Sequence, residues 1–191
     1  MMLTPYIQDI QAKSLGRKIE MRKQKGFSLI ELLIVVAIIL IIAAIAIPNL
    51  LRARMAANES SAVASIRTVT TAEVTYQSAY PTVGYSPDLK SLGGASPCVI
   101  APATACLIDS VLSLNGNPAG SGKSGYFFST GVGTVVGGVN SGYTVLATPL
   151  AIKQTGIRAF CAEEDAVVRV DPNGACSSVE ATVLTFNPLN Q

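Results

Sequence analysis

The sequence predicts an α+β protein in which one long N-terminal helix packs on a small antiparallel sheet. An unbroken apolar run covers residues 27–47, an apolar stripe at helical spacing continues to residue 80, and strand-like segments separated by turn residues follow residue 125. A helical segment followed by a series of strands is typical of α+β domains. At 191 residues, the chain is long enough for one compact domain besides the apolar run.

The N-terminal segment, residues 1–26, is basic. It holds six of the fourteen Lys and Arg residues of the chain but only two of its twelve acidic residues, Asp9 and Glu20. The whole chain has a formal net charge of +2, whereas residues 27–191 carry eight basic and ten acidic side chains, a net charge of −2. A basic cluster before an apolar span keeps the N-terminus in the cytoplasm and sends the C-terminal part across the membrane. By bulk charge, the rest of the chain is not expected to bind nucleic acid.

The apolar run at residues 27–47 is long enough to cross a membrane. Its twenty-one residues extend over roughly 31 Å as a helix, enough for the hydrocarbon core of a bilayer. Glu31 is the one carboxylate in the run, and a lone acid there costs about 2.5–3.5 kcal/mol, so it predicts a partner. An ordinary secretory signal has its cleavage site after the apolar core. Here Gly26 precedes the core, so cleavage at this glycine leaves the helix on the mature protein as an anchor.

The helix is expected to continue past Pro48, where the missing backbone N–H should kink or loosen it, and to end at Pro81. After residue 49 the pattern becomes amphipathic, with apolar residues at steps of three and four or their multiples. These residues are Met55, Ala62, Ile66, Val69, Tyr76 and Tyr80. Much of the remaining surface is polar, with Arg52, Arg54, Asn58, Glu59, Arg67 and Thr71.

The C-terminal part is expected to form a head domain. Turn residues flank a short helical piece near residues 86–94, and a second short helix is expected near residues 107–114. Strand signals follow at residues 125–129, 143–148, 157–161 and 166–170. The acidic residues at 163–165 should turn the last two strands into a hairpin.

Four cysteines, Cys98, Cys106, Cys161 and Cys176, all follow the apolar run. An even number of cysteines in an exported domain favours disulfides, for which three connectivities are possible. We favour the local pairs, Cys98 with Cys106 and Cys161 with Cys176, and the turn at residues 171–174 returns the chain toward Cys161. A zinc site is excluded because the chain has no Cys-x-x-Cys spacing and no histidine.

The segment from Lys25 to Val36, Lys-Gly-Phe-Ser-Leu-Ile-Glu-Leu-Leu-Ile-Val-Val, resembles the class III signal of type IV pilins and type II secretion pseudopilins. In that family a membrane-embedded aspartyl peptidase cleaves after the glycine, and the new N-terminal phenylalanine is N-methylated. The resemblance covers residues 23–54. It implies cleavage between Gly26 and Phe27, methylation of Phe27, and an assembly role for Glu31.

The resemblance also divides the chain into four parts. These are a cytoplasmic leader at 1–26, a transmembrane and assembly helix at 27–47, its amphipathic continuation at 48–80, and a head at 81–191. Translation from Met21, instead of Met1 or Met2, would give a leader of only six residues.

Stacked helices give Glu31 a partner. The N-terminal ammonium group of Phe27 in one subunit is expected to meet Glu31 of its neighbour, which offsets part of the burial cost and fixes the axial register. The resemblance implies that the helix near Pro48 melts on assembly. It also implies as partners further copies in a helical filament, a prepilin peptidase and N-methyltransferase, and an inner-membrane assembly platform. The simpler alternative is a single-span anchor with a tolerated acid near the interface.

Catalysis and ligand binding find little support in the sequence. A Ser–His or Cys–His nucleophile is excluded because histidine is absent and the cysteines are expected to be oxidised. Residues 117–124 look like a phosphate-binding loop, but Asn117 stands where that motif needs glycine, and a strand follows. Glu163, Glu164, Asp165 and Asp171 are candidates for a calcium site, since some major pseudopilins bind calcium in their C-terminal loops, but their spacing matches no defined calcium loop. We expect no enzymatic activity, no cofactor and no metal.

We therefore expect a structural pilin that begins as a single-pass protein of the bacterial inner membrane and ends in an extracellular filament. Filaments for adhesion, twitching motility and DNA uptake assemble through the same kind of N-terminal helix, so this segment does not distinguish among these roles. The alternative within the family is the major pseudopilin of a type II secretion system, with a periplasmic pseudopilus, but the large head and the loop between Cys161 and Cys176 favour the pilus. The alternative from another class is a stationary, membrane-anchored periplasmic binding module.

Overall fold

A computed structural model describes residues 26–94, 97–116, 119–174, 176 and 187–189. The chain separates into two compact units, Met1–Ala43 and Ala44–Gln191, and each is described by itself. The first unit holds the start of helix α1, and the second holds the rest of this helix together with the head.

Helix α1 extends over Leu29–Ala79, 51 residues. The carbonyl of Ser28 accepts the N–H of Leu32 at 3.2 Å, which closes the first turn, and the N–H of Tyr80 donates to the carbonyl of Tyr76 at 2.8 Å in the last. One helix through both the apolar and the amphipathic segment was predicted and is confirmed. The helix also continues through Pro48, so the missing N–H of the proline does not end it.

Two short helices follow, each with an aspartate at its N-cap. Asp88 accepts the N–H of Ser91 at 2.8 Å before α2 (Leu89–Leu92), and Asp109 accepts the N–H of Leu112 at 2.9 Å before α3 (Ser110–Ser113). A side-chain oxygen at this position satisfies a backbone donor that the helix itself cannot. Both helices lie where the sequence predicted a helical piece.

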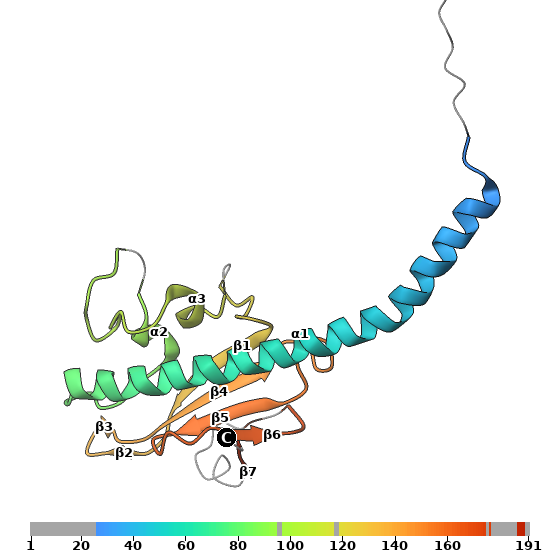
Figure 1. Ribbon diagram of the computed structural model, residues 1–191. Helices are drawn as coiled ribbons and strands as arrows, with labels where there is room; N and C mark the ends of the chain where they lie inside the picture. Colours follow the sequence, from blue (N-terminus) through green and yellow to red (C-terminus); the bar gives the residue numbers. More distant parts are fainter. Residues whose placement is uncertain (1–25, 95–96, 117–118, 175, 177–186, 190–191) are drawn as a thin grey trace, which may run out of the picture. The chain divides into compact units, whose positions relative to one another are not determined.

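The head contains a five-stranded antiparallel sheet in the order β1-β4-β5-β6-β7 (Figure 1). Its strands are β1 (Tyr126–Val132), β4 (Tyr143–Pro149), β5 (Ala159–Glu163), β6 (Arg169–Asp171) and β7 (Asn187–Pro188). Four of them, β1, β4, β5 and β6, correspond to the strands predicted from the sequence. As expected, β5 and β6 form a hairpin, paired from Ala159↔Asp171 to Cys161↔Arg169.

The sequence analysis missed three short strands. Strands β2 (Val135–Val136) and β3 (Val139–Asn140) form a separate two-stranded sheet, and β7 extends the main sheet. Gly137 and Gly138 join β2 to β3 with φ of 61° and 83°. A two-residue hairpin turn of this kind needs positive φ at both positions, which glycine adopts without strain. The Gly-Gly pair was therefore a signal that the sequence did carry.

The core lies between α1 and the sheet, which α1 crosses in Figure 1. Ala62, Ile66, Val69 and Tyr76, four of the six predicted stripe residues, are at most 1% exposed. The other two stripe residues, Met55 and Tyr80, are half-buried at the ends of the stripe. From the sheet, Tyr126, Phe128, Tyr143, Val145 and Phe160 fill the space opposite. Burial of this apolar surface holds the second half of α1 on the head.

Candidate assembly segment and its attachment to the head

The predicted cleavage site lies in an open stretch directly before α1. Gly26, Phe27 and Ser28 precede the helix and are exposed, and Phe27 is 82% exposed. A Cβ built on Gly26 meets no other described atom within 4 Å. Within the described residues, the bond between Gly26 and Phe27 is therefore accessible from all sides, as a peptidase requires.

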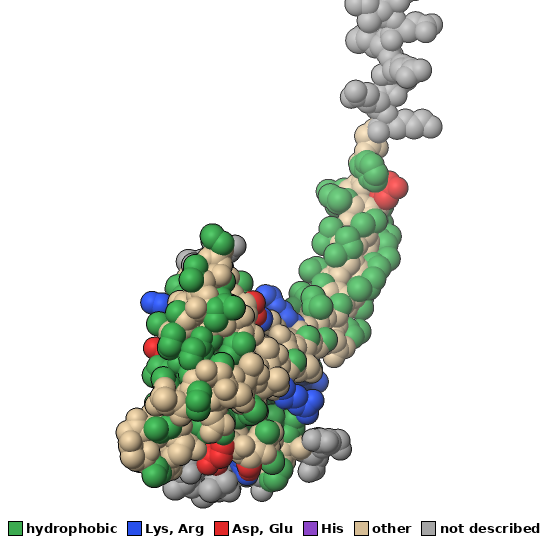
Figure 2. Space-filling view, turned by 90° about the vertical axis from the view of Figure 1, so that its left-hand side faces the viewer, with side chains coloured by type: hydrophobic (Ala, Val, Ile, Leu, Met, Phe, Trp, Pro, Cys, Tyr) green, Lys and Arg blue, Asp and Glu red, His purple; other side chains and the backbone are tan. Residues whose placement is uncertain are grey.

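The first part of α1 exposes apolar side chains around its whole circumference. Its large hydrophobic residues from Leu29 to Leu51 are 43% to 80% exposed. The most apolar 18-residue window of the helix has a mean hydropathy of 3.3 and is 0% buried. Figure 2 shows this helical surface almost entirely as hydrophobic side chains. A surface of this kind needs lipid or other protein segments around it, because exposure to water is unfavourable.

Glu31 is in the first turn of α1 and is exposed. The N-terminal end of a helix carries a partial positive charge, which favours a carboxylate in this turn. Ion pairs among the described residues join Lys123 to Asp109, Arg158 to Glu59 and Arg169 to Asp165. Within that part of the chain, Glu31 has no basic partner, so the cation predicted from the sequence has to come from elsewhere.

A second carboxylate, Glu59, joins α1 to the sheet. It accepts hydrogen bonds from the backbone N–H groups of Ile157 and Arg158 at 3.0 and 3.2 Å. It also accepts hydrogen bonds from Nε and Nη2 of the Arg158 side chain at 2.9 and 2.7 Å. Burial alone would raise the pKa of Glu59, but these bonds outweigh it and hold the pKa below its ordinary value. The sequence analysis assigned Glu59 to the polar surface, which is wrong, because the residue is only 8% exposed.

A third carboxylate, Glu73, was not singled out in the sequence. It is 0% exposed and accepts the N–H and Oγ of Ser86 at 2.8 and 2.6 Å, which holds the segment after α1 against the helix. Burial raises the pKa of Glu73 to about 7, although the two hydrogen bonds from Ser86 lower it. A signal was present, since Glu73 follows Val69 by four residues and precedes Tyr76 by three, on the buried stripe.

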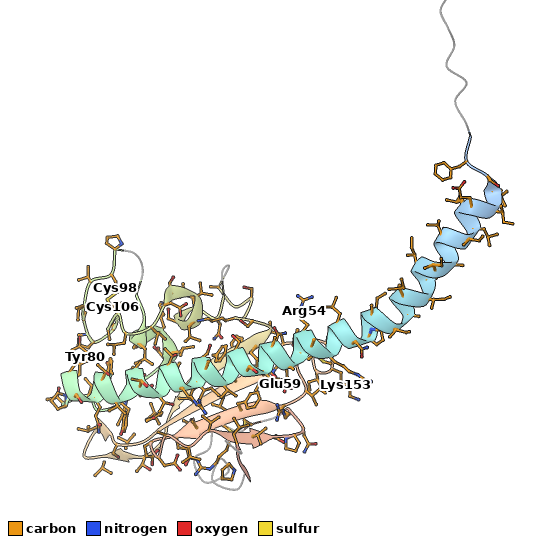
Figure 3. All side chains as sticks on the ribbon, in the orientation of Figure 1. Arg54, Glu59, Tyr80, Cys98, Cys106 and Lys153 are labelled. Carbon is orange, nitrogen blue, oxygen red and sulfur yellow. A yellow bond between two sulfur atoms is a disulfide. The ribbon has the colours of Figure 1, made fainter. Side chains whose placement is uncertain are left out.

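The cysteines form the two local disulfides, Cys98 with Cys106 and Cys161 with Cys176. The favoured connectivity is therefore confirmed. The first closes a loop with a sequence separation of 8, and Figure 3 shows it near Tyr80 at the C-terminal end of α1. The second, with a separation of 15, begins on the buried strand β5.

Comparisons with known proteins agree with these N-terminal features. A family profile described as "Prokaryotic N-terminal methylation motif" matches residues 21–47. The "Type IV wide pilus major component PilA4" of Thermus thermophilus is 53% identical over 57 residues. These matches show a methylation motif in this chain and a likeness of its N-terminal segment to that of a type IV pilin. The alignment covers 30% of this chain and 44% of the Thermus protein, so the chain spans less than half of that relative. No solved structure matches.

The profile match includes the residues on which the pilin prediction depends. Gly26, Phe27 and Glu31 lie within residues 21–47, and Pro48 is the next residue. The α+β pilin-like architecture agrees with this family, as does the apolar helix that leads into the head. The roles of these four residues in cleavage, methylation and assembly remain predictions.

The acidic residues weighed as a calcium site are not gathered into one. Asp165 binds Arg169, and the hydrogen bond from this arginine holds the pKa of Asp165 below its ordinary value. Glu163 and Asp171 are buried on β5 and β6. Among the described residues, no group of three or more Asp, Glu, Cys or His is placed to hold a metal ion. The glycine-rich segment before β1 leads into a strand, and its Lys123 binds Asp109 at 2.9 Å.

Proposed function

We propose that the protein is the structural subunit of a type IV pilus, cleaved between Gly26 and Phe27 and polymerised through residues 27–47. The observation that carries this proposal is the methylation-motif match at residues 21–47, which leads into a helix with exposed apolar side chains on all sides. Cleavage at a motif of this kind leaves the apolar helix on the mature chain. The retained helix then provides the apolar surface through which subunits contact one another. A prepilin peptidase and N-methyltransferase is the processing partner.

Assembly exchanges lipid contacts for contacts between helices. In the inner membrane, lipid tails surround the apolar part of α1, and in the filament the same side chains contact other copies. A head-to-tail contact that does not close on itself produces an open fibre. Pro48 provides a point at which the helix can loosen, because proline has no backbone N–H to donate to the preceding turn. An inner-membrane assembly platform is expected to extract each subunit.

Glu31 selects the register of each incoming subunit. Its partner is the N-terminal amine of Phe27 in a neighbouring copy, which remains a cation after methylation. Within the fibre the pair is removed from water, so an unmatched Glu31 would cost several kcal/mol, and only the matched register avoids this cost.

A pilus is favoured over a type II secretion pseudopilus by the relative named as a wide-pilus major component. Both assemblies use the same N-terminal chemistry, and they differ in where the fibre is found. Fibres sheared from the cell surface should contain this chain if it is a pilin, whereas recovery from the inner membrane alone would favour the pseudopilus.

The proposal is tested by terminal sequencing and mass spectrometry of the mature chain. We expect an N-methylated N-terminus at Phe27. An unprocessed or unmethylated chain that stays in the membrane would indicate the stationary binding module instead.

A further inference from the structure

We propose that the loop between β4 and β5, together with Arg52 and Arg54 on α1, binds anionic phospholipid headgroups while the subunit is in the membrane. The inference rests on the membrane stage of the proposed function. It concerns a surface of the second unit, residues 44–191, and does not involve the assembly contacts of residues 27–47.

The first argument is unpaired positive charge beside the end of the apolar segment. Arg52 and Arg54 follow Leu51 on α1 and are exposed. Neither forms an ion pair within the described residues, and Glu59, the next carboxylate along the helix, is occupied by Arg158. With the hydrocarbon boundary at Ile47, Arg52 lies about 7.5 Å beyond it along the helix axis, at the headgroup layer. Arg54 lies about 10.5 Å beyond it, and its long side chain can extend back toward the same layer.

The second argument is that the loop at residues 150–158 is attached to the same stretch of α1. The side-chain amide of Asn58 donates to the carbonyl of Thr155 at 2.8 Å, and Glu59 holds the end of the loop through Ile157 and Arg158. Figure 3 shows Arg54 and Glu59 on this stretch of α1, with Lys153 beside it. Figure 2 shows basic side chains, in blue, where the apolar surface of α1 ends.

The third argument is the composition and geometry of the loop itself. Lys153 is exposed at its tip with φ of 66° and forms no ion pair among the described residues. The loop exposes three aliphatic side chains, with Leu150 46%, Ile152 52% and Ile157 44% exposed. A basic residue among exposed aliphatic residues suits the boundary between headgroups and acyl chains.

The backbone of the loop is fixed before it meets any partner. The N–H of Lys153 donates to the carbonyl of Gly156 at 2.8 Å, and the N–H of Thr155 donates to that of Ala151 at 2.9 Å. A positive φ is uncommon for a lysine, and these bonds hold it. The backbone of the loop is therefore ordered before binding, which lowers the entropy lost on binding.

The test uses the full chain in nanodiscs of phosphatidylcholine alone or mixed with phosphatidylglycerol. Hydrogen–deuterium exchange of peptides covering residues 150–158 is measured by mass spectrometry. We expect exchange to be about fivefold slower with phosphatidylglycerol, the ratio that one basic residue at an anionic surface provides. Raised salt should remove the difference, because it screens charges at the surface.

Charge reversal provides the controls. Lys153→Glu and Arg54→Glu should each remove most of the lipid difference, while Lys90→Glu, an exposed lysine on α2, should retain it. Equal exchange in both lipids, or a difference that survives Lys153→Glu and Arg54→Glu, would overturn the inference. A further contradicting result would be slow exchange in both lipids that becomes slower still as the number of copies per disc rises. A second copy of the chain, and not lipid, would then cover the loop. Copurification of each variant with the discs tests membrane anchoring separately.

Discussion

Glu73 should make the stability of the head depend on pH, and the substitution Glu73→Gln should remove that dependence. Burial raises the pKa of Glu73 from an ordinary value of 4.5 to about 7 in the folded protein. The folded state therefore holds the proton more tightly than the unfolded state. The resulting stabilisation is fully present below pH 4.5 and is lost as the pH rises through about 7. The difference between the two pKa values corresponds to about 3 kcal/mol of unfolding free energy.

The measurement is urea unfolding of the full chain in detergent micelles at pH values from 5 to 8, followed by near-ultraviolet circular dichroism of the tyrosines. For the parent protein, we expect the unfolding free energy to fall across this range, by about 1.4 kcal/mol per pH unit at most. Glu73→Gln does not titrate and should give a much flatter curve. Glu164→Gln makes the same chemical change at an exposed carboxylate and should keep the slope of the parent.

Other groups around Glu73 do not obscure this range. Tyr76, Tyr85 and Tyr143 lie near Glu73, and burial raises the pKa of each above its ordinary value of 10.0. The carboxylates with lowered pKa values, such as Glu59, lose their stabilisation only at more acidic pH. A parent curve that is flat or rises from pH 5 to 8, or a Gln variant with the slope of the parent, would refute the reasoning.

Three further predictions concern processing, assembly and the attachment of α1. Glu31→Ala should still be cleaved and methylated but should yield filaments reduced by more than about tenfold, counted by electron microscopy, because the unpaired amine of the neighbour stays buried. Replacement of Gly26 by a bulky residue should leave the leader attached, seen as an increased mass of the intact chain. Arg158→Ala should lower the unfolding free energy by about 1 kcal/mol in urea, a figure discounted because this arginine is 46% exposed. Its control, Lys123→Ala, breaks a separate ion pair, with Asp109, that does not include Glu59, and should have a smaller effect. Equal effects would contradict the role given to Arg158.

Patterns local in the sequence predicted most of the fold. The apolar run, the stripe at helical spacing and the proline at residue 81 were enough to predict α1, because helical periodicity relates residues three or four apart. The four longer strands were found because runs of β-branched and aromatic residues bounded by turn residues are also local patterns. Strand β7 was missed because two residues hold too short a pattern, and only pairing with β6 defines it.

The polar contacts that attach the head to α1 could not be predicted in the same way. Glu59 and Arg158 are 99 residues apart in sequence, and no local pattern relates them. Glu59 follows Met55 by four residues and precedes Ala62 by three, so its position on the apolar stripe indicated burial, but the loop after β4 that covers it could not be foreseen. The same holds for Glu73, whose position on the apolar stripe indicated burial, whereas its partner Ser86 depends on how the chain turns after Tyr80. The N-terminal motif is contiguous, so it could be found from the sequence alone, and the profile match covers the same segment. The roles of its individual residues stay predictions.

Electron cryomicroscopy of the purified filament tests the central claim most directly. We predict that the carboxylate of Glu31 lies within ion-pair distance of the methylated N-terminus at Phe27 of a neighbouring subunit, in a core formed by residues 27–47. A map in which Glu31 lies far from every neighbouring N-terminus and faces another cation or solvent would contradict it.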